Sequence, residues 1–174
     1  PLFPYTTLFR SEKAAHYWDN KEQTAMPEEA LKQAVLKYIG ENNTCALATG
    51  TGDYVRCTPI EYSFHDGKFW MFSEGGRKFI GLEKNSHVCL AIYDKYDGFG
   101  NLRSLQVTGI AAMVEPFSEE YNAHAAFKKI PLDALKKLPS PMNLICVTPT
   151  RIDALFSDFK KDGYSSRQVL HQLA

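Results

Sequence analysis

Apolar residues recur along this chain at two different periods, and the first of them predicts a helix. Between residues 28 and 39 the spacing is close to 3.6 residues, which is typical of one buried helical face. The residues with this spacing are Leu31, Val35, Tyr38 and Ile39. Pro27 suits the first helical turn, and Gly40 is a stop signal. We therefore expect a helix over residues 27–40.

Shorter apolar runs, separated by glycine, asparagine and aspartate, predict a series of β-strands after this helix. The expected strands are residues 44–50, 54–64, 68–73, 87–93, 102–115, 143–148 and 151–159. The segments Thr51–Asp53 and His65–Gly67 have the composition of hairpin turns, and Gly109 is a natural position for a β-bulge. The pattern predicts six or seven strands that begin as a meander.

Three further segments combine helix start signals with an apolar face. They are residues 77–84, residues 118–129 with Ser118 as a cap, and residues 131–138 after a proline. Residues 12–23 hold aromatic and alanine residues among charges, which indicates a short amphipathic helix or an arm. The chain is therefore mainly β with peripheral helices, an α+β composition in one domain.

The densest chemistry lies where the strand at residues 68–73 runs into the predicted helix at residues 77–84. Glu74-Gly75-Gly76 permits a close backbone approach, and Arg77 and Lys78 follow it directly. Arg56 starts the preceding strand, and a hairpin would bring that strand to about 5 Å. Two cations at a helix start, with a third nearby, suit a phosphate monoester. Ordinary solvated surface charges would give the same spacing.

The order of these motifs resembles the pyridoxamine 5′-phosphate oxidase-like family of FMN-binding split β-barrels. The resemblance rests on Arg56-x-x-Pro59, Ser73 at a strand end, Gly-Gly-Arg77-Lys78, Asn85-x-x-Val88 and the strand Leu105–Ala111, and it covers roughly residues 30–159. It implies a six- or seven-stranded antiparallel split β-barrel that forms a homodimer with FMN at the interface.

The resemblance also implies which residues bind the cofactor. Arg56, Ser73, Arg77 and Lys78 would hold the FMN phosphate, and Gln106 would contribute from the same chain or from the dimer partner. The strand segment that would border the isoalloxazine ring is Cys57, Thr58, Pro59, Ile60 and Glu61. Cys57 is expected to be a spectator thiol, although the neighbouring Arg56 could make it reactive. No catalytic residue is implied.

Three departures from the family's pattern bear on the substrate. Glu61 stands where the oxidases that act on pyridoxamine phosphate carry a lysine, and the helix at residues 118–129 lacks their tyrosine, arginine and serine in register. The tail has Arg167 without a histidine two places later. We therefore expect an FMN-dependent oxidoreductase that exchanges hydride through flavin N5 with an unidentified small molecule, with NAD(P)H as a possible donor. A non-catalytic flavin or haem storage protein and a divergent oxidase remain the alternatives.

Composition excludes several other classes. Twenty basic and twenty acidic residues balance, so no overall field favours nucleic acid or an anionic membrane. The four cysteines form no Cys-x-x-Cys pair, and no histidine lies in a metal-ligand motif, so no metal site is expected. Widely spaced thiols and the lack of a long apolar run indicate a cytoplasmic protein.

The ends of the chain are expected to lie outside the functional domain. Residues 1–11 match the translation of a widely used sequencing-adapter oligonucleotide, so we expect an artefact there; a genuine extended arm is the alternative. Residues 12–26 would form an N-terminal arm or short helix, and residues 27–160 the FMN-binding barrel. Residues 161–174 form a polar C-terminal tail.

Overall fold

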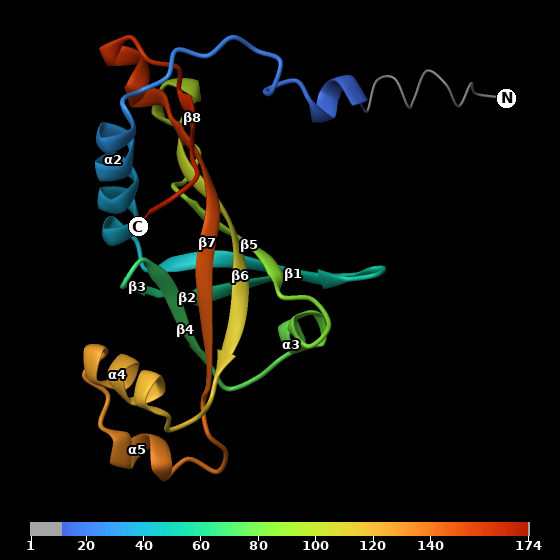
Figure 1. Ribbon diagram of the computed structural model, residues 1–174, viewed down its shortest axis with the longest axis vertical. Coiled ribbons are helices and arrows are strands. Elements are labelled where there is room, and N and C mark those ends of the chain that lie inside the picture. Colours follow the sequence, from blue (N-terminus) through green and yellow to red (C-terminus); the bar gives the residue numbers. More distant parts are fainter. Residues whose placement is uncertain (1–11, 174) are drawn as a thin grey trace, which may run out of the picture.

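The computed structural model describes residues 12–173, so the expected adapter-derived segment lies outside the described residues. The chain forms an antiparallel β-sheet that curls into a split barrel, with helices against its sides (Figure 1). Residues 12–15 are helical, within the segment expected to form a short helix or an arm. The further helices are α2 (Glu28–Glu41), α3 (Lys78–Leu82), α4 (Glu119–Phe127) and α5 (Leu132–Lys136), with 3₁₀ turns η1 (Phe99–Asn101) and η2 (Ser157–Asp162). The predicted mainly antiparallel split β-barrel with peripheral helices is confirmed.

Eight strands make the sheet, in the order β2-β1-β5-β6-β7-β4-β3, with β8 paired to β7. Their bounds are β1 (Thr44–Thr51), β2 (Tyr54–Glu61), β3 (Ser63–His65), β4 (Lys68–Ser73), β5 (His87–Tyr93), β6 (Arg103–Val114), β7 (Asn143–Phe156) and β8 (Arg167–Leu170). In Figure 1, α3 lies on the opposite side of the β6–β7 pair from α4 and α5. Seven strands lie on the continuous path and β8 is an addition from the tail.

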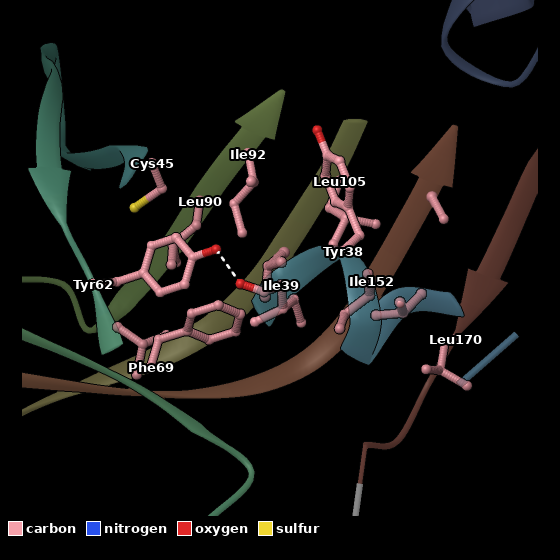
Figure 2. Packing of buried hydrophobic residues seen from close by; sticks show 14 of the residues in the cluster. Tyr38, Ile39, Cys45, Tyr62, Phe69, Leu90, Ile92, Leu105, Ile152 and Leu170 are labelled. Atoms are coloured by element: carbon pink, nitrogen blue, oxygen red, sulfur yellow. Dashed lines mark hydrogen bonds between the residues drawn. The ribbon is translucent and has the colours of Figure 1, made fainter. Parts of the chain in front are cut away.

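The predicted strand at residues 54–64 is divided in two at Tyr62. β2 pairs with β1, whereas only the three residues of β3 pair with β4. The division follows from burial: the Tyr62 side chain turns into the core, where its hydroxyl donates a hydrogen bond of 2.8 Å to the carbonyl oxygen of Ile39 (Figure 2). The expected pairing of Arg56 with the strand at residues 68–73 is therefore wrong.

A β-bulge joins the two longest strands. The register of β6 with β7 shifts between Thr108 and Gly109, and Gly109 faces Pro149. A Cβ atom at Gly109 would lie 2.7 Å from the carbonyl oxygen of Thr148, so only glycine fits this approach. Because the bulge accommodates Pro149, β7 continues through it, and the two separate strands expected at residues 143–159 are one.

Two apolar cores lie on either side of the β4–β7 region. The larger core fills the barrel and includes Tyr38, Leu90 and Ile152 (Figure 2). The smaller core joins the outward side chain of Trp70 to α4 and α5 through Tyr121 and Leu135. Within the described chain, no helix has the length and apolar character needed to cross a membrane.

Candidate functional site

The predicted phosphate residues meet at the turn between β4 and α3. Ser73 ends β4 with its side chain on the side of the larger core, and its hydroxyl donates a 3.1 Å hydrogen bond to the carbonyl oxygen of Gly75. The Lys78 ammonium donates to the same oxygen. Since both side chains converge on one acceptor, the Ser73 and Lys78 polar atoms lie within about 6 Å of each other.

Lys78 is a buried cation. The residue is only 6% exposed, and among residues 12–173 it forms no ion pair. Burial lowers the pKa of the ammonium, because removing water disfavours the charged form. Two of its three N–H donors remain available beyond the bond to Gly75. Within the described residues, the Lys78 side chain is therefore a buried cation without an ion-pair partner.

The two arginines lie on the β2 side of the same turn. The Tyr54 hydroxyl donates a 2.9 Å hydrogen bond to the carbonyl oxygen of Arg77, and the Arg77 guanidinium lies 6.0 Å from the centre of the Tyr54 ring. Arg56 follows two residues later on the same strand face, about 7 Å along β2. Neither arginine forms an ion pair within the described part of the chain. Tyr54 thus fixes one arginine close to the other.

The backbone conformation at Gly76 sets the shape of the turn beside these cations. Gly76 has a φ of 113°, which a residue with a Cβ rarely adopts. The Asn143 amide donates hydrogen bonds of 3.1 and 3.2 Å to the carbonyl oxygens of Ser73 and Glu74, and this pins the turn to β7. The turn is therefore held in one conformation by groups outside it.

The helix that follows this turn is shorter than the sequence indicates. Residues 77–84 are predicted to be helical, but α3 has only five residues, and Arg77 is its flanking residue. The amides of Phe79 and Ile80 already donate to Gly76 and Arg77 carbonyl oxygens at 3.2 Å each. A helix macrodipole thus adds little here, and the positive charge at this turn comes from the side-chain cations.

The residues expected to border the flavin ring divide between two faces of β2. Alternation places Thr58 and Ile60 on the core side, where Ile60 packs against the larger core. Cys57, Pro59 and Glu61 point to the other face, away from Arg56. The Cys57 thiol is exposed. Because Arg56 points to the opposite face of β2, its guanidinium does not lie against this thiol.

Gln106 lies on this other face of the sheet, apart from the phosphate cluster. It is exposed on β6 and shares a cross-strand row with Pro59, Ala46, Ala91 and Asp153. The two alanines make the middle of the row shallow. Pro59 and Gln106 are three strand spacings apart, about 14 Å. Within one chain, Ser73, Arg77 and Lys78 thus lie at the turn, Arg56 lies two residues beyond Tyr54, whose hydroxyl bonds to Arg77, and Gln106 lies apart on the other sheet face.

The loop with exposed aromatic residues lies far from this cluster within one chain. Tyr96 and Phe99 are 62% and 83% exposed and follow the end of β5, whereas α3 precedes its start. Seven residues of strand separate the two ends by about 20 Å. Either aromatic side chain could therefore reach a flavin at the α3 site only from a second copy of the chain.

A pair of histidines, which the sequence did not connect, joins α4 to β3. The His65 Nε2 and His124 Nδ1 atoms are 3.0 Å apart, and His65 Nδ1 lies 2.8 Å from an Asp66 carboxylate oxygen. The Trp70 indole stacks on His65 with the ring centres 4.9 Å apart. Burial lowers the pKa of His124 to about 4. The residues are 59 positions apart in sequence, so no local pattern signals their contact.

Glu61 also has a partner that sequence spacing does not indicate. The Lys128 ammonium, just after α4, lies 2.6 Å from a Glu61 carboxylate oxygen. Among residues 12–173, no three histidine, cysteine, aspartate or glutamate side chains are placed to hold a metal ion. The unpaired cations near α3 are thus the best candidate binding site.

An antiparallel sheet that curls into a half-open barrel, with helices against its sides, defines the class of split β-barrel proteins. A family model described as pyridoxamine 5′-phosphate oxidase matches residues 31–156. The chain belongs to the pyridoxamine 5′-phosphate oxidase family. A search of curated proteins found no match.

Solved structures share the fold at low sequence identity. A FAD-binding protein from Mesorhizobium loti is 15% identical, with a TM-score of 0.56 over 70% of this chain and 90% of that one. The heme storage protein HutZ from Vibrio cholerae is 19% identical, with a TM-score of 0.58 over 71% and 91%. General Stress Protein 26 from Bacillus anthracis str. Sterne is 19% identical, with a TM-score of 0.57 over 81% and 98%. At these identities the likeness shows the fold alone.

Proposed function

We propose that this protein binds FMN and that Arg56, Ser73, Arg77 and Lys78 hold the flavin phosphate. The observation that carries the proposal is the buried Lys78 ammonium, which has no carboxylate partner within the described residues. A buried charge without a partner lowers stability, and a phosphate near charge −2 would compensate it. Arg77 and Arg56 supply further donors suited to phosphate oxygens.

The donor set fits a phosphate monoester better than a carboxylate ligand, because it combines an ammonium with two guanidinium groups. Gly76 keeps the backbone close to the ammonium: an ideal Cβ there would lie 3.4 Å from Lys78 Nζ. Family membership and the resemblance to FAD-binding structures support a flavin as the group that carries this phosphate. The strand segment Thr58–Glu61 would border the flavin ring.

We place the flavin at a homodimer interface, because one chain leaves the site incomplete. Gln106 lies on the outer sheet face, together with exposed apolar side chains that a second copy would cover. These are Val55, Tyr93 and Ile110, which are 78%, 65% and 36% exposed. A second chain would bring its own Gln106, Tyr96 or Phe99 toward the flavin.

The proposed activity is an oxidoreductase reaction between the flavin and a small molecule, with NAD(P)H as the candidate donor. A bound flavin supplies hydride transfer through its N5 atom. The chain's own residues bind the phosphate, position the ring and exclude water. We assign no catalytic residue.

The visible absorption spectrum of the purified full chain tests this proposal. With FMN added, we expect flavin bands near about 370 and 450 nm that bleach with NADH or NADPH under anaerobic conditions. Arg77→Ala should weaken FMN binding by about 10-fold, because one charge-assisted contact is lost. Lys136→Ala, an exposed cation on α5, is the matched control. A colourless protein that takes up no FMN contradicts the proposal.

Two alternatives have specific support. A heme storage protein shares the fold, so a Soret band without flavin uptake would favour a haem-binding function. Family membership favours a divergent pyridoxamine 5′-phosphate oxidase, and Lys128 brings a cation next to Glu61. Formation of pyridoxal phosphate and hydrogen peroxide from pyridoxamine phosphate, at saturating FMN, would support that oxidase. Their absence would exclude it.

A further inference from the structure

Two hydrogen bonds join α3 to the β1–β2 hairpin, one at each end of the helix. At the start, the Tyr54 hydroxyl donates to the carbonyl oxygen of Arg77 at 2.9 Å. At the end, the Asn85 side-chain amide donates to the carbonyl oxygen of Gly50, also at 2.9 Å. Within the described chain, no other hydrogen bond joins residues 77–86 to β1 or β2. These two bonds therefore hold both ends of α3 against the hairpin.

Between the two hydrogen bonds, the contact of α3 with β1 is steric. A Cβ atom at Gly81 would lie 3.1 Å from the Cβ and Oγ1 atoms of Thr49, so helix and strand are already in close approach. The Thr49 hydroxyl is buried and has no hydrogen-bond partner among the described residues. This packing limits how near α3 can come, but it supplies no directional bond that would fix the orientation of the helix on the strand.

Asn85 lies where the ladder between β1 and β5 ends. The two strands pair only at residues 46–48 of β1, so the Gly50 carbonyl oxygen lies beyond their ladder, and the Asn85 amide bonds to it there. The Asn85 Oδ1 atom accepts a 3.0 Å hydrogen bond from the His87 amide, and the Asn85 backbone amide donates to the Gly81 carbonyl oxygen at 2.9 Å. One residue thus connects the end of α3, the start of β5 and the tip of the hairpin.

The cations of the candidate phosphate site are divided between the two elements that Asn85 joins. Arg77 and Lys78 belong to the α3 segment, whereas Arg56 belongs to β2. Thr49, the residue against which α3 packs, is the cross-strand partner of Arg56. The distance between Arg56 and the α3 cations is therefore set by how α3 is held on the hairpin.

We propose that Asn85 is a positioning residue of the phosphate site. Its bond to Gly50 holds α3 at the separation from β2 at which Arg56 and the α3 cations contact one phosphate group. Charge-assisted hydrogen bonds need donor–acceptor distances of about 2.8 Å, so a shift of α3 by about 1 Å would break such a contact. The proposal rests on the proposed function, which supplies the phosphate, and it adds a residue that acts on the site without touching the ligand.

A double-mutant cycle on the FMN affinity of the flavin-stripped full chain tests this role. Asn85→Ser removes the donor to Gly50 but keeps a hydroxyl that can accept from the His87 amide. We expect Asn85→Ser and Arg56→Ala each to weaken FMN binding by about 10-fold. If Asn85 acts by placing the α3 cations relative to Arg56, the double variant should lose about 10- to 20-fold, rather than the roughly 100-fold of independent effects.

Three further measurements separate positioning from a general loss of structure. Riboflavin, which lacks the phosphate, should bind Asn85→Ser within about 2-fold of the wild type. Asn42→Ser is the matched control, because it removes an amide donor to the Tyr38 carbonyl oxygen, also at 2.9 Å, and should leave FMN affinity unchanged. Tyr54→Phe removes the other bond to α3 and keeps the ring. It should show the same non-additivity with Arg56→Ala, even if Asn85→Ser fails to fold.

Three results would overturn the role of Asn85. A loss of about 100-fold in the double variant would mean that Asn85 and Arg56 act independently. Unchanged FMN affinity in Asn85→Ser would mean that packing alone holds α3. Equal losses of FMN and riboflavin would mean that the substitution disturbs the fold rather than the phosphate site. In all three cases the wild type still binds FMN and the proposed function stands, whereas a wild type that binds no FMN contradicts the proposed function itself.

Discussion

The two helical flanks of the sheet, one beside α3 and one beside α4, differ in whether their charged side chains are paired within the described chain. Beside α3, three cations have no carboxylate partner among the described residues, and one of them, Lys78, is buried. Beside α4, polar groups are paired within the chain. The pairs are Lys68–Glu120 at 3.9 Å, Lys128–Glu61 at 2.6 Å and His65–His124 at 3.0 Å.

The difference separates a candidate site with unpaired cations from a flank whose charged side chains are paired within the chain. Paired groups compensate each other's desolvation, so the α4 flank gains nothing from a further ion. An unpaired buried charge is retained at a cost in stability, and such strained groups are concentrated at functional sites. The contrast predicts that substitutions beside α3 change binding, whereas substitutions beside α4 change stability.

The largest expected effect is the loss of flavin binding in Lys78→Met. Methionine replaces the apolar stem of lysine but removes the ammonium group and its charge, so FMN affinity should fall by at least about 100-fold. The free energy of unfolding of the flavin-free protein should not fall, because burial disfavours the Lys78 ammonium in the folded state. Isothermal titration calorimetry and urea unfolding measure the two quantities.

The opposite result for Lys78 would remove the contrast between the flanks. Lys137→Met, an exposed lysine at the end of α5, is the control for loss of a positive charge. If Lys78→Met unfolds at lower urea concentration and binds FMN normally, the ammonium is a structural group that stabilises the turn through Gly75, and the anion site lies elsewhere.

The second effect concerns the acid sensitivity of the α4 flank. The pKa of His124 is lowered to about 4, chiefly by burial, and His65 and Lys128 lower it further while Glu61 opposes them. The unfolded chain, with an ordinary pKa near 6.5, binds a proton first as the pH falls. The stability from neutral His124 is therefore complete above about pH 6.5 and is lost toward pH 4.

We expect this group alone to remove roughly 2 kcal/mol from the free energy of unfolding between about pH 6.5 and 5. His124→Phe cannot titrate and should flatten the pH dependence in that interval, even if its absolute stability is lower. His16→Phe, at an exposed histidine, should leave the slope as in the wild type. An unchanged slope in His124→Phe would mean that His124 takes up its proton without disturbing the α4 flank.

A smaller effect tests how closely α3 must approach the sheet. A Cβ atom at Gly81 would lie 3.0 Å from the Gly50 amide nitrogen and 3.1 Å from Thr49. Gly81→Ala should therefore push α3 away from β1 and cost about 1 kcal/mol, after the better helix propensity of alanine is included. Thermal unfolding measures the cost, and weaker FMN binding would accompany it. Gly100→Ala, with no atom within 4 Å of its added Cβ, should change neither.

The sequence predicted those features that depend on local patterns. Ser118 caps α4, where its hydroxyl accepts a hydrogen bond from the Tyr121 amide, and the bulge falls at Gly109. The division at Tyr62 was missed, because a tyrosine in an apolar run does not show which core it enters. β8 was missed because it has only four residues and begins with the polar Arg167 and Gln168. Gln168 is buried through hydrogen bonds to the backbone at Thr24, Met26 and Ser165, more than 140 residues away for the first two.

The candidate site was likewise predictable only in those features that local sequence patterns determine. Glycines beside Arg77 and Lys78 indicated a phosphate turn, and the structure brings Ser73 and Lys78 to one carbonyl oxygen there. That Lys78 is buried while Arg77 is exposed follows from the packing of α3 against β1, which residue order does not encode. The location of Gln106 on the other sheet face required the strand register.

The smallest expected effect concerns Glu61. This residue ends β2, the strand that carries Arg56 of the proposed phosphate site, and its carboxylate pairs with Lys128 beside α4. Glu61→Gln removes the ion pair with Lys128. The Glu61 side chain is 59% exposed and the Lys128 side chain is 25% exposed. Pairs this exposed contribute less than about 1 kcal/mol, so the urea midpoint should shift only slightly. FMN affinity should change by less than about 3-fold, because Lys128 holds the Glu61 carboxylate, so that the proposed flavin ring would border the strand segment at this end without bonding to that carboxylate. A larger change in affinity with unchanged stability would show that Glu61 reaches the flavin, and the ring would then lie against the α4 flank as well.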